Sequence, residues 1–428
     1  MNQDIHIPAL ARVEGEGALT VRLKDGEVNE IILNIYEPPR FFEGFLNGRY
    51  FQDVPDITAR ICGICPVAYQ MSAVQALEAA LQVTISPEVR ALRQLLYCAE
   101  YIESHALHIY LLQAPDLVGY ESAISLAADA PDLVKKALRL KKAGNELLKT
   151  IGGRSVHPVN TCVGGFYRWP TNESIHALVP ELEWAKQASI ETAQWAATLN
   201  YPDFKQEYEF VALNRIDEYA IYDGYIASST GKRVDPVDFE KNYIETHVPQ
   251  SNALHSHTAA NTTYFVGPLA RFNINYKKLR PIARETAKQI GFQPPVRNPY
   301  KSLLARAIEL VHCCDLAIEL ANDYHPQGAS FKEFKVRPGE GWGVSEAPRG
   351  LLYHRYVVDE QGLVRFARIT PPTAQNFAQM EADLWAIAPT VVKKPQEEAS
   401  LAFEHLLRSY DPCISCATHF LKLKIDRE

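Results

Sequence analysis

Apolar and polar residues alternate along residues 18–37, on both sides of Asp25-Gly26. Alternation with a period of two predicts β-strands, and Asp-Gly is a preferred pair for a tight hairpin turn. The same pattern recurs at 350–370, where LLYHRYVV and LVRFARI flank DEQG. We therefore expect two β-hairpins, one toward each end of the chain.

Between these hairpins, apolar residues recur at spacings of three and four, which is typical of helices that bury one face. Proline and glycine separate the stretches, as expected at helix ends. The predicted helices cover 67–82, 88–114, 131–150, 173–199, 276–291 and 299–323, with a shorter helix at 396–409. The pattern predicts a mainly α fold with small β appendages (α+β), in which a large helical body brings the two chain ends together.

Composition excludes several classes of function. Of the 428 residues, 47% are apolar and 22% are charged, which is ordinary for a globular protein with a large core. The net charge of −7 gives no basic field for nucleic acid or anionic lipid. No apolar stretch reaches the roughly 18 residues of a membrane span, and the N-terminus lacks the features of a secretory signal. We expect a cytoplasmic protein without a membrane span.

Four of the eight cysteines form two pairs with CxxC spacing, one from each end of the chain. Cys62 and Cys65 lie in RICGIC, and Cys413 and Cys416 lie in DPCISC. In a reducing compartment such pairs indicate metal or redox chemistry. The other four cysteines lack this spacing, and we interpret them as small core residues: Cys98, Cys162, Cys313 and Cys314.

The first pair precedes a predicted helix. Pro66 suits the first helical position, so Cys65 is expected at the helix N-terminus, where free N–H groups and the helix dipole favour a thiolate. Thiolates select zinc, copper(I), iron or other thiophilic metals over magnesium and calcium. Three kinds of site remain open from spacing alone. They are a structural zinc site, two independent redox dithiols, and a catalytic metal centre with ligands from distant segments.

Motifs along nearly the whole chain resemble, in their order, the large subunit of nickel–iron hydrogenases. They are ARVEGEG at 11–17, FFEGFLNGR at 41–49, RICGIC at 60–65, ESHALHIYLLQAPD at 103–116, GGRSVHP at 152–158, GPLAR at 267–271, APRG at 347–350, PPTAQN at 371–376 and DPCISCATH at 411–419. Each motif is weak by itself, but the ordered set is specific. GPLAR and PPTAQN are most similar to the cytoplasmic, NAD(P)-linked branch, often called sulfhydrogenases.

The resemblance implies one large-subunit domain over residues 1–428 that oxidises H2 and reduces protons reversibly and heterolytically at a nickel–iron centre. It implies that all four CxxC cysteines bind nickel, with Cys62 and Cys413 terminal and with Cys65 and Cys416 also bridging to iron. The iron is expected to carry cyanide and carbon monoxide ligands, which require dedicated maturation proteins. The alternative is a non-catalytic, metal-stapled homologue related to complex I subunits, which would lack one or more of these cysteines.

The resemblance also implies roles around the two metals. Arg349 and Thr373 would donate hydrogen bonds to cyanide, and Pro348 and Pro372 would form apolar walls. Without the motif set, Arg349 would be interpreted as a surface charge after a proline turn.

Three acids complete the implied catalytic set. Glu14 would accept a proton from Cys413, although a solvated loop glutamate is the plainer interpretation. Asp116 and Asp411 would lie with Arg349 at the open face of the nickel, where an Asp–Arg pair can equally be structural.

A second metal site is implied near the C-terminus. Its ligands for magnesium (or iron) would be Glu43, His419 and the backbone carbonyl of Ile369. Family precursors are commonly cut after the matching histidine once nickel is inserted, so we expect an endopeptidase to remove residues 420–428. One departure from the family lies near the first CxxC, where Tyr69 replaces a common histidine and is expected to tune the redox potential.

The chain offers no electron path of its own. The remaining cysteines lack iron–sulfur spacing, and GEGWGV at 339–344 is interpreted as a loop rather than a dinucleotide motif. An iron–sulfur small subunit is therefore expected, together with flavin/NAD(P)-binding and ferredoxin-like subunits. The region of His157 is expected to face the small subunit, unless His157 only caps a turn before Pro158.

Overall fold

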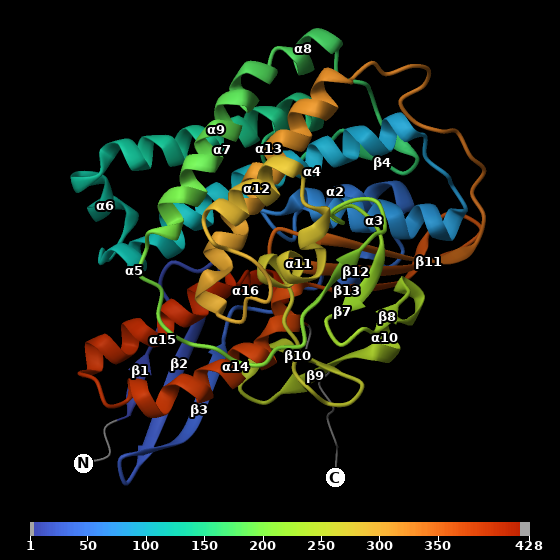
Figure 1. The fold of residues 1–428 in the computed structure, drawn as a ribbon. Helices are drawn as coiled ribbons and strands as arrows, with labels where there is room; N and C mark the ends of the chain where they lie inside the picture. The colour runs from blue at the N-terminus through green and yellow to red at the C-terminus, as the bar shows by residue number, and fades with distance from the viewer. Residues whose placement is uncertain (1–3, 420–428) are drawn as a thin grey trace, which may run out of the picture.

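Long helices packed side by side form the body of the protein. The computed structural model describes residues 4–419. The four longest helices of the body are α4 (Pro87–Leu107), α7 (Pro131–Gly152), α9 (Val179–Ala197) and α13 (Ser302–Asn322). Helix α4 packs against α7 and α13, and α13 also packs against α9 (Figure 1). Gly144 allows α7 to approach α4 closely, because a Cβ there would lie 2.7 Å from the carbonyl oxygen of Ala99.

The other helices surround this body. They are α1 (Phe42–Leu46), α2 (Val54–Ala59), α3 (Pro66–Leu81), α5 (Ala114–Val118), α6 (Ala123–Asp129), α8 (Asn172–His176), α10 (Phe239–Asn242), α11 (Pro268–Asn275), α12 (Pro281–Gln289), α14 (Pro372–Val391), α15 (Gln396–Tyr410) and α16 (Ile414–Ala417). Several of them begin at proline, which lacks the N–H that the first turn leaves unpaired. The mainly helical fold class is confirmed.

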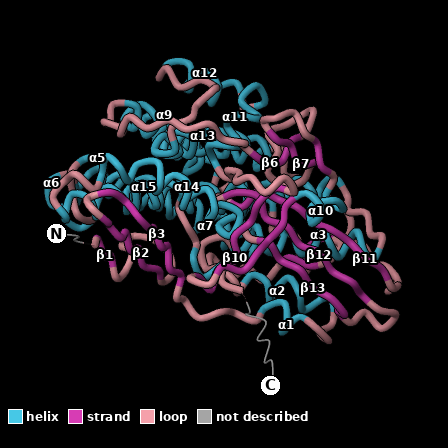
Figure 2. Tube along the Cα trace, turned by 90° about the horizontal axis from the view of Figure 1, so that it is seen from below, coloured by secondary structure: helices cyan, strands magenta, loops and turns pink. Residues whose placement is uncertain are grey.

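The strands form small antiparallel sheets. One contains β1 (Ile5–Ile7), β2 (Gly17–Lys24) and β3 (Glu27–Ile35), and another contains β11 (Gly339–Ala347), β12 (Gly350–Val358) and β13 (Val364–Thr370). The remaining strands are β4 (Thr161–Cys162) with β5 (Gly165–Phe166), β6 (Val211–Asn214) with β7 (Tyr225–Ser228) and β8 (Arg233–Val234), and β9 (Tyr243–Val248) with β10 (Ser251–Thr258). Figure 2 shows the β11–β13 sheet beside α1, α2 and α3.

Both predicted hairpins are confirmed, and each sheet contains one further strand. β2 and β3 turn at Asp25-Gly26, where both residues have positive φ, as a tight two-residue turn requires. β12 and β13 form the second hairpin. The interpretation of 339–344 as a loop is wrong, since these residues lie in β11.

Most predicted helices are confirmed, with differences at prolines and ends. The stretch 88–114 is helical to Leu107 and continues as a π-helix, His108–Gln113. The stretch 276–291 is a 3₁₀ turn, Tyr276–Lys278, followed by α12, because Pro281 starts a new helix. The sequence pattern missed α14.

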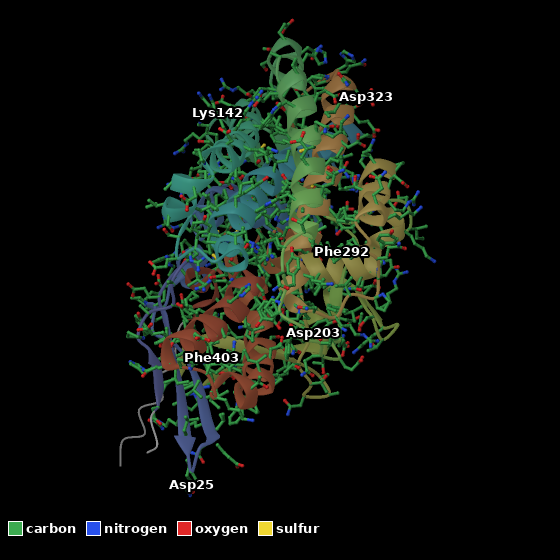
Figure 3. The ribbon with its side chains drawn as sticks, turned by 60° about the vertical axis from the view of Figure 1, so that its left-hand side comes forward. Asp25, Lys142, Asp203, Phe292, Asp323 and Phe403 are labelled. Atoms are coloured by element: carbon green, nitrogen blue, oxygen red, sulfur yellow. The ribbon has the colours of Figure 1, made fainter. Side chains whose placement is uncertain are left out.

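The two ends of the chain lie together. The β1–β3 sheet packs against α14 and α15, which come from the C-terminal part of the chain (Figures 1 and 2). In Figure 3, Asp25 marks the tip of the β2–β3 hairpin and Phe403 lies on α15. Within residues 4–419, no helix is both long enough and apolar enough to cross a membrane.

Candidate metal centre

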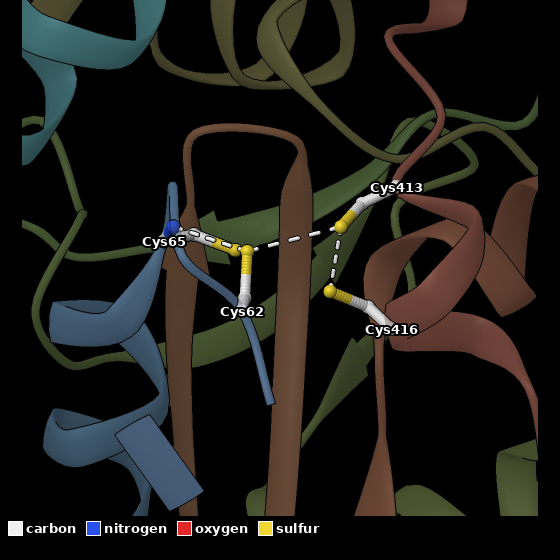
Figure 4. A group of neighbouring side chains, drawn as sticks. All are labelled: Cys62, Cys65, Cys413 and Cys416. Atoms are coloured by element: carbon white, nitrogen blue, oxygen red, sulfur yellow. Dashed lines mark hydrogen bonds between the residues drawn. The ribbon is translucent and has the colours of Figure 1, made fainter. Parts of the chain in front are cut away.

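The four CxxC cysteines meet in one buried cluster. Their sulfur atoms all lie within 4.8 Å of one another, although one pair precedes α3 and the other flanks the start of α16 (Figure 4). The Sγ atoms of Cys62 and Cys413 are 3.8 Å apart, and no cysteine of the cluster is more than 8% exposed. The two dyads therefore form a single site.

The first dyad is held at the start of α3. The backbone N–H of Cys65 donates to Cys62 Sγ (3.1 Å). The buried carboxylate of Glu100 on α4 accepts the next helix N–H groups, from Val67 (2.6 Å) and Ala68 (3.2 Å). The expectation that these N–H groups would stabilise the Cys65 thiolate is thus wrong, because Glu100 occupies them.

The second dyad is positioned by contacts to segments far away in the sequence. α15 ends at Tyr410, and the next residue, Asp411, has a φ of 56° that turns the chain toward the cluster. The backbone N–H of Cys413 donates to Thr373 Oγ1 on α14 (2.9 Å). The N–H of Ile414 donates to the carbonyl of Glu14 (2.9 Å), and Glu14 pairs with Cys413 as in a parallel ladder.

The four thiols differ in how readily they ionise. Burial raises the pKa of Cys65, Cys413 and Cys416. Burial also opposes ionisation of Cys62, but hydrogen bonds from the other three thiols outweigh it and lower the Cys62 pKa well below its ordinary value. A soft cation that binds this cluster would displace the thiol protons, because the thiolate is the metal ligand.

Arg349 is placed at the cluster by a hairpin turn. Ala347 pairs with Gly350, so Pro348 and Arg349 form the two-residue turn between β11 and β12. The Nε–H of Arg349 donates to the carbonyl of Asp411 (2.9 Å), and its Nη2 lies 3.0 Å from Asp411 Oδ1. Its Nη1 is buried and has no hydrogen-bond partner within residues 4–419. A charged donor therefore remains available beside the thiols.

Asp411 lies beside two buried arginines and a buried histidine. Burial alone would raise its pKa, but Arg349, His108 and Arg306 lower it. Its Oδ1 lies 4.0 Å from His108 Nε2, and its Oδ2 lies 3.9 Å from Arg306 Nη2. Asp411 is thus held as a carboxylate deep in the protein.

Asp116 pairs with Arg408 and Arg12 and not with the residues around Asp411. Its carboxylate accepts hydrogen bonds from Arg408 Nε (2.7 Å) and Nη2 (2.8 Å) and pairs closely with Arg12. None of its described contacts is with Arg349 or Asp411. Because Arg408 lies in the last turn of α15, Asp116 anchors the helix that leads into the second dyad.

Glu14 lies against the second dyad, as expected for a proton acceptor. Cys413 Sγ is 3.1 Å from Glu14 Oε2, and the backbone N–H of Ser415 donates to the same oxygen (3.1 Å). The Ser415 hydroxyl donates to Oε1. Glu14 is half-buried, so its carboxylate lies between the buried thiol and the surface.

Glu43 and His419, two of the three expected ligands of the second metal site, meet, and Ile369 contacts Glu43 through its backbone N–H. Glu43 Oε1 accepts the N–H of Ile369 (2.7 Å), and Glu43 Oε2 lies 2.9 Å from His419 Nε2. These residues line a cavity of about 590 Å³ that reaches Cys416. Glu245, which no sequence motif indicates, also lines this cavity, and its buried carboxylate oxygen Oε1 has no hydrogen-bond partner within residues 4–419.

Pro348, Pro372 and Thr373 are buried near the cluster. Pro372 is the first residue of α14 and lies close to Gly350, at the end of the Arg349 turn. Sequence analysis also missed Arg306 and His108. His108 lies inside the 103–116 motif, whereas the only signal for Arg306 is a charge inside an apolar helical stretch.

The donor set fits a soft metal. Four sulfurs at mutual coordination distance match nickel, iron or zinc and not magnesium. A purely structural zinc site has no use for the unpartnered Arg349 Nη1 or for a carboxylate on a ligand thiol. The surroundings therefore favour a catalytic metal over a structural one.

Comparison with known proteins agrees with this geometry. The nickel-dependent hydrogenase family matches residues 40–152 and 254–419. Sulfhydrogenase 1 subunit alpha of Pyrococcus furiosus is 34% identical over 424 residues, with 98% of each chain covered. The NAD-reducing hydrogenase subunit beta of Cupriavidus necator is 28% identical, with 98% of this chain and 96% of the relative covered.

A solved structure agrees as well. The crystal structure of an NAD+-reducing [NiFe]-hydrogenase in the H2-reduced state superposes with a TM-score of 0.89 at 27% identity, covering 97% of this chain and 99% of that chain. Fold, sequence and the four-sulfur cluster lead to the same assignment: this chain belongs to the nickel-dependent hydrogenase family, as a large subunit.

Proposed function

We propose that this chain is the catalytic subunit of a cytoplasmic nickel–iron hydrogenase that cleaves H2 heterolytically and reversibly, and exchanges electrons with NAD(P)(H) through an iron–sulfur partner subunit. The observation that carries the proposal is the meeting of four thiols from opposite chain ends beside a carboxylate and a buried guanidinium. The NAD(P) link is supported by similarity to the NAD-reducing hydrogenase.

The four thiolates would hold nickel, and Cys65 and Cys416 would also hold an iron with cyanide and carbon monoxide ligands. When bound, this group supplies the redox chemistry and the polarisation of H2. The unpartnered Arg349 Nη1 provides a donor of the kind that a cyanide nitrogen needs in an apolar pocket. Thr373, Pro348 and Pro372 complete the walls.

The chain itself provides the proton path. A proton on Cys413 Sγ has an acceptor 3.1 Å away at Glu14 Oε2. The N–H and hydroxyl of Ser415 hold this carboxylate in place, so that proton transfer needs no rearrangement. Because Glu14 is half-buried, it can pass the proton toward solvent.

The Glu43, Ile369 and His419 site would bind magnesium or iron and fix the end of the second dyad. The N–H of His419 donates to the carbonyl of Asn252 (2.9 Å), so the segment is already pinned on one side. Glu245 adds a carboxylate oxygen that fits a hard cation.

The iron–sulfur subunit would dock near the first dyad. Val156, Val159 and Tyr167 expose apolar side chains there, at 48%, 38% and 57%. His157 is tied to the same region, since its Nδ1–H donates to the carbonyl of Ala59 (2.7 Å), close to Cys62. Flavin/NAD(P)-binding and ferredoxin-like subunits would complete the electron path.

Maturation proteins would insert the metals, and an endopeptidase would then cut between His419 and Phe420. Residues 420–428 lie outside the described part of the chain. Intact mass of the nickel-loaded enzyme is expected to correspond to residues 1–419, and an active, loaded chain of 428 residues would contradict cleavage.

One experiment tests the proposed function. Metal analysis of the purified complex is expected to find nickel and iron, and infrared spectra are expected to contain cyanide and carbon monoxide stretches. Cys65→Ser should lose these bands, whereas Cys162→Ser, which changes a cysteine outside the cluster, should keep them. Zinc without such bands would favour the non-catalytic, metal-stapled homologue instead.

A further inference from the structure

A fully buried arginine, Arg271 on α11, takes no part in the chemistry described above. Its Nε–H and Nη2–H donate to the two carboxylate oxygens of Glu309 (2.7 and 2.8 Å). Its Nη1–H donates to Glu346 Oε2 (2.9 Å). All three side chains are 0% exposed, so this network lies entirely in the interior.

The same guanidinium also holds the turn that carries Arg349. Nη1 donates to the carbonyl of Ala347 and Nη2 to that of Pro348, both at 2.9 Å. A guanidinium has five N–H donors, and each donor of Arg271 thus has an acceptor. Two of the five acceptors are the carbonyls of the two residues that precede Arg349.

Neighbouring groups hold this turn from other sides. The hydroxyl of Tyr101 donates to the carbonyl of Glu346 (3.0 Å), and the Arg271 guanidinium lies over the Tyr101 ring at 5.1 Å. Gly267, in the same motif as Arg271, contacts the turn directly, because a Cβ there would lie 2.8 Å from the carbonyl oxygen of Arg349. The GPLAR and APRG motifs therefore form one packed unit.

This unit determines where the Arg349 side chain begins. Arg349 contacts Asp411 through two donors, its Nη1 has no hydrogen-bond partner within residues 4–419, and its charge interacts with the cysteines of the cluster. A turn free to shift would move that donor away from the cluster, and displacements near 1 Å cost up to about 100-fold in rate in well-aligned sites.

We propose that Arg271 is a positioning residue for the hydrogenase reaction: by holding the carbonyls of Ala347 and Pro348, it fixes the Arg349 guanidinium against Asp411 at the four-thiol site. This inference rests on the proposed function, because Arg349 matters only if the thiols hold the nickel–iron group. If Arg271 had a purely structural role, it would stabilise the fold without affecting the environment of the metals.

The test compares Arg271→Lys with Arg93→Lys in the purified complex. Lysine keeps the charge but has only three N–H donors, so it cannot reproduce the five hydrogen bonds of the planar guanidinium. Arg93 is an equally buried arginine, paired with Glu78 and remote from the Arg349 turn in its hydrogen bonds. Arg271→Lys is expected to load nickel, shift the cyanide stretches and lower kcat about tenfold with little change in KM. Arg93→Lys should keep the wild-type stretches and a kcat within about twofold.

Unshifted cyanide stretches and unchanged kcat in a nickel-loaded Arg271→Lys enzyme would overturn the inference.

If Arg271→Lys does not load nickel, a second pair of variants with smaller changes tests the same inference. Tyr101→Phe removes one hydroxyl from the turn and should shift the stretches, whereas Tyr110→Phe removes a buried hydroxyl bonded to Thr192 and should not. Equal spectra for these two variants would also overturn the inference. Wild-type enzyme without cyanide stretches would instead refute the proposed function.

Discussion

Glu14 shows how the backbone places one residue at the four-cysteine cluster. Its carbonyl pairs with Ile414 N–H, and Gly15 follows with a φ of 88° and fits against Ile414 and Ser415. These contacts aim the carboxylate at Cys413 and leave little freedom for it to move. Backbone pairing, rather than the acidity of the side chain, distinguishes Glu14 from the exposed Glu16.

We predict that Glu14→Gln keeps nickel but loses H2-dependent dye reduction by at least about 100-fold, because the glutamine amide oxygen can still accept one hydrogen bond from Ser415 but the side chain cannot take up the proton. Turnover and nickel content of the same preparation measure this. Glu16→Gln is the matched control and should retain wild-type turnover. Equal activity of the two variants would move the proton path away from Glu14.

Tyr69 is the second informative residue. Its hydroxyl is buried and has no hydrogen-bond partner within residues 4–419, while all four cysteines of the cluster raise its pKa in addition to the larger effect of burial. The hydroxyl is therefore a donor close to the sulfurs without a protein acceptor of its own. Its ring lies 5.7 Å from that of His354.

We predict that Tyr69→Phe keeps nickel and shifts the midpoint potential of the centre by about 40 mV, the equivalent of one hydrogen bond of about 1 kcal/mol in a one-electron couple. The potential should fall, since a donor to a thiolate stabilises the more electron-rich state. An infrared-monitored redox titration measures it. Tyr97→Phe removes another buried, unpartnered hydroxyl and should leave the potential unchanged.

At the scale of elements, the fit of β11 on α3 positions the first dyad. A Cβ at Gly339, Gly341 or Gly343 would lie 2.0, 2.1 or 2.2 Å from the carbonyl oxygens of Ala80, Ala76 and Ser72. Alternate residues of the strand thus face successive turns of the helix. The glycines allow the strand to lie directly on the helix that begins just after Cys65.

We predict that Gly341→Ala destabilises the protein by about 3 kcal/mol and lowers nickel occupancy, because the added methyl group overpacks the contact with α3. Denaturant unfolding and metal analysis measure both effects. Glu340→Ala, on the other face of the same strand, removes only a partly exposed pair with Arg355 and should cost under about 1 kcal/mol. Similar losses for the two variants would argue against a tight strand–helix contact.

The same strand marks a limit of sequence-based prediction. Alternation identified the β2–β3 and β12–β13 hairpins, because their buried faces carry large apolar side chains. In β11 the buried face includes glycines, so the pattern resembles a loop until the helix that covers it is known. α14 was missed for a related reason, since it is buried on most sides and lacks a clear polar face.

The candidate site also contains residues that the sequence predicts and residues that it does not. Spacing identified the cysteines, and motif resemblance identified Glu14, Glu43, Arg349, Asp411 and His419, which the structure brings to the two proposed metal sites. The partners of Asp116 were not foreseeable, because Arg12 and Arg408 come from opposite ends of the chain. Arg271, Arg306 and Glu245 acquire their surroundings only through tertiary packing, which a linear pattern does not contain.

At the scale of the whole molecule, the four-cysteine cluster joins segments from the two chain ends. One dyad belongs to the start of α3, and the other follows α15, which packs with the N-terminal sheet. Without a metal, no bond links the four buried cysteines, and they contribute little cohesion. A ligand that binds this arrangement and not the unfolded chain must stabilise the whole fold.

We therefore predict that nickel-loaded protein is more stable than the metal-free chain by at least about 4 kcal/mol, the value for a ligand at 1,000 times its Kd. Thermal unfolding of protein matured with and without nickel measures the difference. Cys413→Ala should unfold like the metal-free wild type and gain nothing from nickel, because the link from the C-terminal end is cut. If that variant were stabilised as much as wild type, the metal would lie elsewhere in the protein, and the chain ends would be held together by packing alone.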